Sequence, residues 1–480
     1  MSWDSEALRI PATAYAQTLW PITIFNMRAT SIIVLGLLTI LSACKNNNEF
    51  QIIIEANRTN YDTLFIQELI TGRTIAKVPL DKLNKNYSFK IDEATLGSLS
   101  VIGTETTYLT IIRPGVKKTI LIDSTSLRTK QSIPDSLANY LWKSTNQMFS
   151  LHDKVIFAQD NPDKVKSIFD SLVQVRNEQL NKFKSQLTAN EFGILDYQNK
   201  ARAYSFLMFY GRIVKRYSPD NEFFSFISNI DNENIYSKSL PDNLLYKYEI
   251  QILRERDSIE NIDVFLKFIE TQTTTKDLQD FLKAIYLKSV IEQPSYWRRH
   301  ENLFTTNTIK EALQRESTNK YSYLINKASN SFYASQKGVK GYDFTAFKLD
   351  GTELKLSDLK GKIVVIDTWA TWCGPCIDQR PNMIELAKKH KDNLNIVFLM
   401  VSVDSSVDRW KKYVTRTNEN QYGLEVNIPD GMNGEFGGKY LIKAIPKYIL
   451  IDKDGVIVDS NLPEPSIGME RLIQSLSEKL

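Results

Sequence analysis

Two cysteines separated by a glycine and a proline are the residues of this 480-residue sequence whose types and spacing best fit chemistry. They lie in the segment WCGPC, as Cys373 and Cys376. Thiol-disulfide exchange needs one thiolate that attacks and a second thiol that resolves the mixed disulfide. At the start of a helix, free backbone N–H groups and the helix dipole stabilise a thiolate. We therefore expect Cys373 to be the nucleophile and Cys376, one turn further and shielded from solvent, to be the resolving thiol, with Pro375 in the first helical turn.

The elements around this motif have an α/β pattern. GKIVVIDTWA directly precedes it and is apolar enough to be a strand buried in a central sheet, and NIVFLMVSVD predicts another such strand. Between them, IDQRPNMIELAKKH predicts a helix that is broken at Pro381. Hairpins are expected about Asp350 and Asp454, each followed by glycine, and SSVDRWKKYVTRTNE and the C-terminal segment predict helices. Residues 339–480 are thus expected to form an α/β domain with its cysteines at a strand-to-helix junction.

Residues 45–130 predict a small all-β domain. Seven short segments with alternating apolar positions are separated by turn residues: FQIII, DTLFIQEL, RTIAKVPL, YSFKI, SLSVIG, TYLTII and KTILI. We expect a sandwich, and interpret it as a binding or spacer module because it contains no chemical motif.

Residues 131–338 change to a helical period and predict an α-helical domain. The sequence NPDKVKSIF places Asn161 as a cap and Pro162 as the first residue of one helix. Several aromatic residues of this region could line a peptide-binding groove, but a helical core is the simpler interpretation. These residues are Phe206, Phe209, Tyr210 and Trp297.

The N-terminal residues resemble the signal of a bacterial lipoprotein. SIIVLGLLTIL has the length of a signal-peptide core, too short to span a bilayer, and Leu41 to Cys44 resemble a lipobox, in which the cysteine becomes lipid-modified. The resemblance implies that residues 1–44 are a signal peptide, with translation starting at Met27, and that Cys44 anchors the protein to a bacterial membrane of the cell envelope, facing the periplasm. The alternative is a buried apolar segment. An exported chain suits disulfide chemistry, and Cys44 would have no redox role.

The overall composition excludes several classes of function. Sixty Lys and Arg residues against 56 Asp and Glu residues leave a net charge of +4, too small to predict binding to nucleic acid. The three histidines lie outside any metal-binding pattern, so neither a metal nor another cofactor is expected beyond the redox-active disulfide. A zinc-binding pair would need two further ligands.

Residues 341–480 resemble the thioredoxin-fold domain of the TlpA and ResA type of membrane-anchored thiol-disulfide oxidoreductases. The resemblance rests on GTELKLSDLKGKIVVIDTWATWCGPC, on Ile445-Pro446 at the position of the family's cis-proline, and on the closing hairpin ILIDKDGVIV. In thioredoxins the aspartate matching Asp367 is buried behind the resolving cysteine and takes its proton. Asp367 is therefore the candidate proton acceptor and donor, the alternative being an exposed aspartate at a strand end.

The resemblance also implies a docking surface for substrates. A cis bond at Pro446 would leave the backbone before it free to pair with an extended segment. The expected docking residues are Trp372, Gly374, Pro375, Ile445 and Pro446. Trp369 is expected in the core. Lys447 replaces the threonine that usually follows the proline; it could lower the pKa of the nucleophile, favour acidic partners, or be a solvated surface lysine.

Taken together, these features predict an envelope reductant of disulfides in exported proteins. The Gly-Pro dipeptide is that of thioredoxin, whose potential of about −270 mV is strongly reducing. The resemblance implies apocytochrome c as a substrate class, a role in cytochrome c maturation, and a transmembrane thiol carrier as electron donor. One alternative is a partner-binding lipoprotein with an accessory redox domain. Another is a thiol peroxidase, but Ile366 and Ala370 stand where its proline and its threonine or serine should lie.

Overall fold

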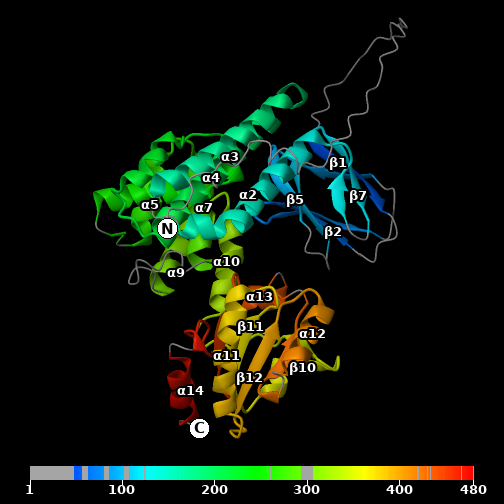
Figure 1. Cartoon of the computed structure of the whole chain (residues 1–480), viewed down its shortest axis with the longest axis vertical. Coiled ribbons are helices and arrows are strands. Elements are labelled where there is room, and N and C mark those ends of the chain that lie inside the picture. Colours follow the sequence, from blue (N-terminus) through cyan, green and yellow to red (C-terminus); the bar gives the residue numbers. More distant parts are fainter. Residues whose placement is uncertain are drawn as a thin grey trace, which may run out of the picture.

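The computed structural model divides the chain into a β-sheet region, a helical region and an α/β unit that contains the cysteine pair (Figure 1). Residues 48–56, 63–80, 86–101, 107–123, 126–158, 161–256, 258–259, 261–292, 306–418, 421–429, 431–432, 434–465 and 468–478 are described. The predicted signal peptide, with Met27 and Cys44, and the aromatic Trp297 lie outside these residues. No helix in the described ranges has the length and apolarity needed to cross a bilayer.

The β-sheet region has two four-stranded sheets within its described residues, ordered β4-β1-β7-β8 and β3-β2-β5-β6. Their strands are β1 (Glu49–Ala56), β2 (Thr63–Glu68), β3 (Thr74–Pro79), β4 (Asn86–Lys90), β5 (Thr95–Val101), β6 (Tyr108–Ile112), β7 (Lys117–Ile122) and β8 (Leu127–Thr129). Ile52 from one sheet and Leu64 and Leu99 from the other belong to one buried core, as in a sandwich. The seven predicted strands are all present; β8, three residues long, was missed.

Helix α2 (Ile133–Ala158) lies along the edge strand β6, and its side chains bind backbone groups of β6 as a further strand would. The side-chain amide of Asn139 donates to the carbonyl oxygen of Leu109 at 2.7 Å, and its oxygen accepts the N–H of Leu109 at 3.0 Å. Asp135 accepts the N–H of Ile111 at 2.8 Å and forms a buried ion pair with Lys118 at 2.6 Å. Because an unpaired strand edge invites aggregation, these side chains protect β6 and fix the helical region to the sheet.

The helical region is built around one large apolar core. Its α-helices after α2 are α3 (Pro162–Lys182), α4 (Ala189–Phe209), α5 (Asp242–Glu255), α6 (Ile262–Gln272), α7 (Lys276–Glu292), α9 (Thr306–Arg315) and α10 (Ser322–Ala334). Asn161 caps α3 as predicted, accepting the N–H of Asp163 at 3.0 Å. Phe206 and Tyr210 are buried in the core, so for them the groove interpretation is wrong.

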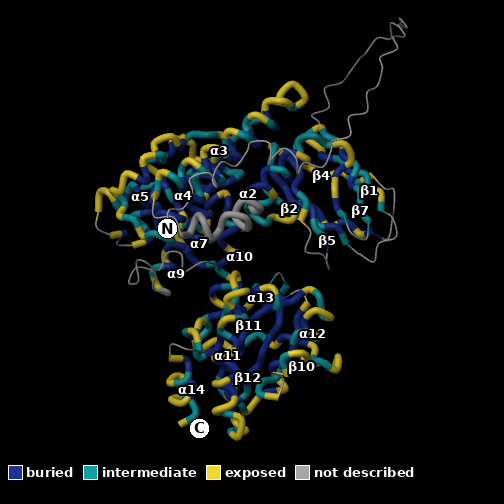
Figure 2. Tube along the Cα trace, in the orientation of Figure 1, coloured by how far each residue is buried: buried dark blue, intermediate teal, exposed yellow. Residues whose placement is uncertain are grey.

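The C-terminal unit has a seven-stranded sheet in its described part, ordered β10-β9-β13-β12-β11-β14-β15. Its elements are β9 (Thr345–Lys348), β10 (Glu353–Lys355), β11 (Ile363–Trp369), α11 (Gly374–Lys389), β12 (Ile396–Ser402), α12 (Val407–Thr417), β13 (Leu424–Asn427), α13 (Glu435–Lys439), β14 (Lys447–Ile451), β15 (Ile457–Asp459) and α14 (Met469–Ser477). Strand β11 is buried along its whole length, in the dark interior of this unit in Figure 2. It pairs parallel to β12 and antiparallel to β14, which makes it a central strand, as its apolar sequence predicts.

Helix α11 continues through Pro381, and the predicted break at this residue is wrong. Proline has no N–H, so the carbonyl of Ile377 loses its helical partner there. Buried side chains lie on both sides of the proline, among them Cys376 before it and Met383 and Ile384 after it. Packing of both halves against the sheet therefore outweighs the cost of about 3 kcal/mol that an internal proline brings.

Candidate active site

Cys373 and Cys376 lie at the N-terminus of α11, directly after the loop that follows β11, and form a disulfide with a Cα–Cα distance of 5.2 Å. Cys373 is the N-cap residue, and its Sγ accepts the backbone N–H of Cys376 at 3.1 Å. The prediction that Cys373 immediately precedes the first helical turn is confirmed, and Pro375 lies within that turn. A thiolate at the Cys373 position would receive this N–H and the positive end of the helix dipole.

The rim of the site combines an open face with a second backbone segment. Trp372 is 53% exposed, although both cysteines are nearly buried. A Cβ atom on Gly374 would meet no other atom within 4 Å, so space is open above the first turn. On the other side, the carbonyl oxygen of Ile445 lies 3.7 Å from the Sγ of Cys373, and the bond between Ile445 and Pro446 is cis, as the resemblance implied. A substrate segment at this rim can thus meet the sulfur atom and the backbone of Ile445 together.

Asp367 lies in the middle of β11, opposite Met400 on β12 and Tyr448 on β14. It is only 4% exposed, so the alternative of an exposed aspartate at a strand end is wrong. Burial raises the pKa of Asp367 to about 7, although the positive charge of Arg380 acts in the opposite direction. A carboxyl group with this pKa can both accept and return a proton near neutral pH.

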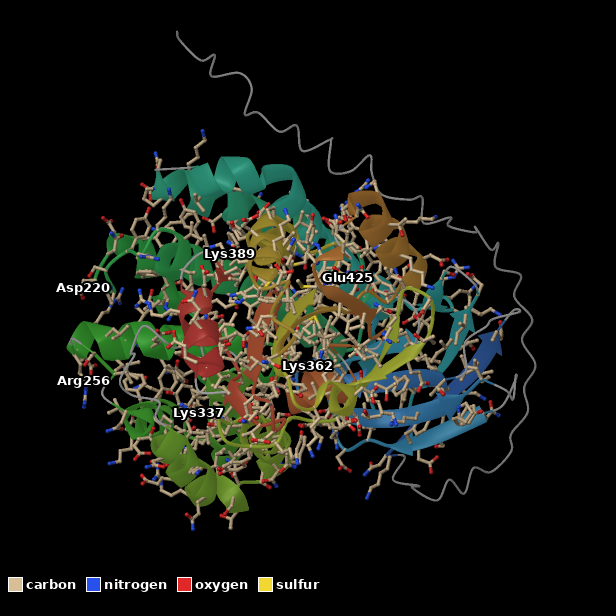
Figure 3. The ribbon with its side chains drawn as sticks, turned by 90° about the horizontal axis from the view of Figure 1, so that it is seen from below. Asp220, Arg256, Lys337, Lys362, Lys389 and Glu425 are labelled. Atoms are coloured by element: carbon tan, nitrogen blue, oxygen red, sulfur yellow. A yellow bond between two sulfur atoms is a disulfide. The ribbon has the colours of Figure 1, made fainter. Side chains whose placement is uncertain are left out.

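Arg380 on the buried face of α11 forms an ion pair with Glu425 of β13, which the sequence did not predict. Both side chains are almost fully buried, and the guanidinium carbon lies 3.7 Å from the centroid of the Trp369 ring. Figure 3 shows Glu425 inside the outline of the C-terminal unit, whereas Asp220 and Arg256 lie at the outer edge of the helical region. The available signal was the spacing: Arg380 follows Cys376 by four residues and therefore shares its buried helix face.

Asp404, just after β12, holds the loop that carries the first cysteine and was also missed. Its carboxylate accepts the backbone N–H of Thr371 at 2.9 Å and the hydroxyl of Thr371 at 2.6 Å. Ser402 donates to the same carboxylate at 2.9 Å. Thr371 precedes Cys373 by two residues, so Asp404 fixes the approach of the chain to α11. The available signal was an aspartate two residues after the end of a buried parallel strand.

Lys447 is tied back to the loop that precedes it. Its ammonium group donates to the carbonyl oxygen of Leu441 at 2.9 Å, and the residue is partly buried. The interpretation as a solvated surface lysine is therefore wrong. Whether its charge affects the nucleophile or the choice of partners stays a prediction.

The described residues contain no group of three or more histidine, cysteine, aspartate or glutamate side chains that could hold a metal ion. The group suited to redox chemistry is the cysteine pair, which can exchange two electrons and two protons between a disulfide and a dithiol.

The region around this site is similar to known redox proteins. Residues 336–472 match the family model described as Redoxin. The thiol-disulfide oxidoreductase ResA of Bacillus thuringiensis is 33% identical over 129 residues, which are 27% of this chain and 71% of the relative. The thioredoxin-like protein YneN of Bacillus subtilis is 33% identical over 124 residues, or 26% of this chain and 70% of the relative.

A solved thioredoxin domain of a thiol-disulfide oxidoreductase from Bacteroides vulgatus is 25% identical and covers 29% of this chain and 98% of that chain, with a TM-score of 0.27. The residues that match the Redoxin model include the disulfide, the buried Asp367 and the cis-proline. This chain therefore belongs to the ResA-like family of redoxins and is a thiol-disulfide oxidoreductase whose C-terminal unit has a thioredoxin fold.

Proposed function

We propose that this enzyme reduces disulfides in exported proteins. The observation that carries the proposal is the position of Cys373, which caps α11 next to an exposed tryptophan and the Ile445 carbonyl, with Asp367 buried in the strand before it. The Gly-Pro dipeptide between the cysteines supports a reducing rather than an oxidising role, because it occurs in thioredoxin at about −270 mV.

In the proposed reaction the reduced enzyme transfers two electrons to its substrate. The Cys373 thiolate attacks one sulfur of the substrate disulfide, forming a mixed disulfide and releasing a substrate thiolate, which takes a proton from solvent. Cys376 then gives its thiol proton to the Asp367 carboxylate and attacks the Sγ of Cys373. This step releases the second substrate sulfur as a thiolate, which takes a proton from solvent, while Asp367 later returns its proton to solvent. It leaves the Cys373–Cys376 disulfide that the structure contains.

Turnover requires a thiol donor that reduces this disulfide again. We propose a transmembrane thiol carrier as that donor, because a lipid on Cys44 would hold the enzyme at the envelope membrane, facing the periplasm. Exported proteins with oxidised cysteines, including apocytochrome c before haem attachment, are the proposed substrates. The proposal includes no other cofactor and no nucleic-acid partner.

A trapping experiment tests the proposal. In a Cys376→Ala variant the mixed disulfide on Cys373 cannot be resolved, so exported proteins should remain attached and be identifiable by mass spectrometry. The matched control is Cys373→Ala, which should trap none of them. Capture of glutathione alone would contradict a dedicated reductase, and a potential close to that of a strong oxidant, about −120 mV, would contradict the reducing role.

Two other functions are less well supported. A partner-binding lipoprotein with an accessory redox unit is favoured by the size of the β-sheet and helical regions, and would trap a single abundant partner instead of a set of substrates. A thiol peroxidase is disfavoured because Ile366 and Ala370, both fully buried, occupy the positions of its polar residues. Consumption of peroxide by the reduced enzyme would support the thiol peroxidase function instead.

A further inference from the structure

The loop before Pro446 joins the redox site to the helical region. It runs from the end of α13 at Lys439 to the start of β14 at Lys447 and includes Ile445, whose carbonyl oxygen lies 3.7 Å from the Sγ of Cys373. A shift of this loop would therefore change the position of the docking backbone relative to the attacking sulfur. The contacts that hold the loop decide how well a substrate segment is aligned.

Leu441 is the first contact between this loop and the helical region. Its backbone has a φ of 53°, in the left-handed region that a leucine rarely adopts. Its neighbours Tyr440 and Ile442 are buried in the core of the C-terminal unit, whereas Leu441 is buried in the core of the helical region. The unusual backbone thus turns one apolar side chain of the loop into the neighbouring core. Leu441 and Ile445 are four residues apart, at most about 14 Å along an extended chain.

Lys443 provides a second contact, two residues before Ile445. It forms an ion pair at 3.1 Å with Glu292, the last residue of α7, and Glu292 is only 11% exposed. Burial acts to raise the pKa of Glu292, but Lys288 and Lys443 together lower it, so the carboxylate is charged and paired. A partly buried ion pair has a more defined geometry than one in open solvent.

Further contacts make this connection stiff. Lys447 donates to the Leu441 carbonyl and so closes the loop across Pro446. Helix α10 contacts both α7 and α13 (Figure 1). The segment after α10 then pairs with the hairpin of β14 and β15, where the N–H of Gly338 donates to the carbonyl oxygen of Ile457 at 2.8 Å. The hydroxyl of Tyr440 donates to the carbonyl of Tyr342 in the same connecting segment at 3.0 Å. The helical region therefore holds the C-terminal unit on both sides of the loop.

We propose that the helical region is part of the substrate-docking apparatus: through Leu441 and Lys443 it holds Ile445 in the position that captures extended, disulfide-bearing polypeptides. This inference rests on the proposed function, because it assumes that a substrate backbone pairs at Ile445. Leu441, Lys443 and Lys447 are positioning residues in this account. A small disulfide that reaches Cys373 without pairing to the backbone does not need them.

The test compares two substrates of the reduced full chain: a synthetic extended peptide with one disulfide, and 5,5′-dithiobis(2-nitrobenzoic acid). Leu441→Ala should lower kcat/KM for the peptide by about tenfold, mainly through KM, and change the rate with the small disulfide less than about twofold. The matched control is Leu354→Ala, which removes a similarly buried leucine from edge strand β10 and should leave the ratio of the two rates unchanged.

Exchanging the charges of Lys443 and Glu292 tests the proposal independently, even if Leu441→Ala does not fold. These variants are made with Lys288→Met, because Lys288 also pairs with Glu292, at 2.6 Å. In that background Lys443→Glu and Glu292→Lys should each reduce the rate with the peptide, and combining the two should restore most of it. Equal losses with both substrates, or no loss in any variant, would overturn the inference. Wild-type enzyme that reacts with the small disulfide but reduces no peptide would instead contradict the proposed function, so the two failures can be distinguished.

Discussion

The guanidinium group of Arg380 stacks on the Trp369 ring, 3.7 Å from its centroid, while the same group pairs with the buried carboxylate of Glu425. The positive charge of Arg380 also acts on Asp367, whose pKa it lowers. With Glu425 ionised, Arg380 is already neutralised, and burial is left to dominate the pKa of Asp367. Burial is thus the main cause of the raised pKa of Asp367, and we expect the pairing of Arg380 with Glu425 to limit how far the guanidinium group lowers it.

Glu425→Gln should move the pH dependence of the resolving step to lower pH. The substitution leaves the positive charge of Arg380 without its partner, which stabilises the Asp367 carboxylate and lowers its pKa. In single-turnover reduction of a peptide disulfide, the midpoint should fall by on the order of one pH unit. The variant will also be less stable, by about 3–5 kcal/mol, because it breaks a buried pair.

The control for this prediction is the double variant with Asp367→Asn. Without a titrating group at position 367, Glu425→Gln should no longer shift the midpoint, although its effect on stability persists. A shift of the same size in the double variant would mean that the pair acts on a cysteine and not on Asp367.

Asp367→Asn should make the oxidised protein more stable at alkaline pH and slow its chemistry. The folded pKa of Asp367, about 7, is above the ordinary value of 3.8, so the folded state holds this proton more tightly than the unfolded chain. Stability from this group is complete below about pH 4, declines as the pH rises towards 7 and stays low above it. The asparagine variant lacks this loss, which is on the order of 4 kcal/mol at pH 8.

Chemical denaturation of the oxidised chain at pH 4 and at pH 8 measures the difference in unfolding free energy between Asp367→Asn and the unmodified chain. Hydrogen exchange in β11 is a second, local measurement of the same difference. Asp378→Asn, at an exposed position of α11, is the control; it retains Asp367 and should keep the pH dependence of the unmodified chain. If Asp367→Asn gave the same gain at both pH values, ionisation of Asp367 would not be its cause.

The sequence predicts what depends on neighbours along the chain. Alternating apolar residues indicate the strands of the β-sheet region, Asn161 before a proline indicates a cap, and the Cys373 position follows from one strand-to-helix junction. Buried partners from distant segments leave a weaker signal. Arg380 resembles a surface residue until Glu425 is placed beside it, and nothing in the periodicity indicates that Leu441 enters a core formed far upstream.

Asp404→Ala should loosen the chain before the nucleophile. The change removes the acceptor of the N–H and the hydroxyl of Thr371, which are partly buried, and of the buried Ser402 hydroxyl, and leaving a buried donor unpaired costs about 1–3 kcal/mol. We expect a lower rate with the peptide and with the small disulfide alike, because Cys373 itself is displaced. Asp404→Asn keeps one oxygen acceptor and should recover part of the rate; equal losses in both variants would argue against the hydrogen bonds as the cause.

Asp135→Asn should weaken the attachment of α2 to β6 without affecting the redox site. Lys118 and Asp135 are both buried, and burial lowers the pKa of Lys118 even though Asp135 acts to raise it. Removing the carboxylate leaves the ammonium group without its counter-charge, at a cost of about 3–5 kcal/mol in unfolding free energy. Hydrogen exchange in β6 should report the loss, and replacing Lys118 by methionine in the same chain should recover much of it. The rate with the small disulfide should be unchanged, since α2 and the cysteine-bearing helix α11 lie in different parts of the molecule (Figure 1). A parallel loss of that rate would show that the β-sheet region also supports the dithiol.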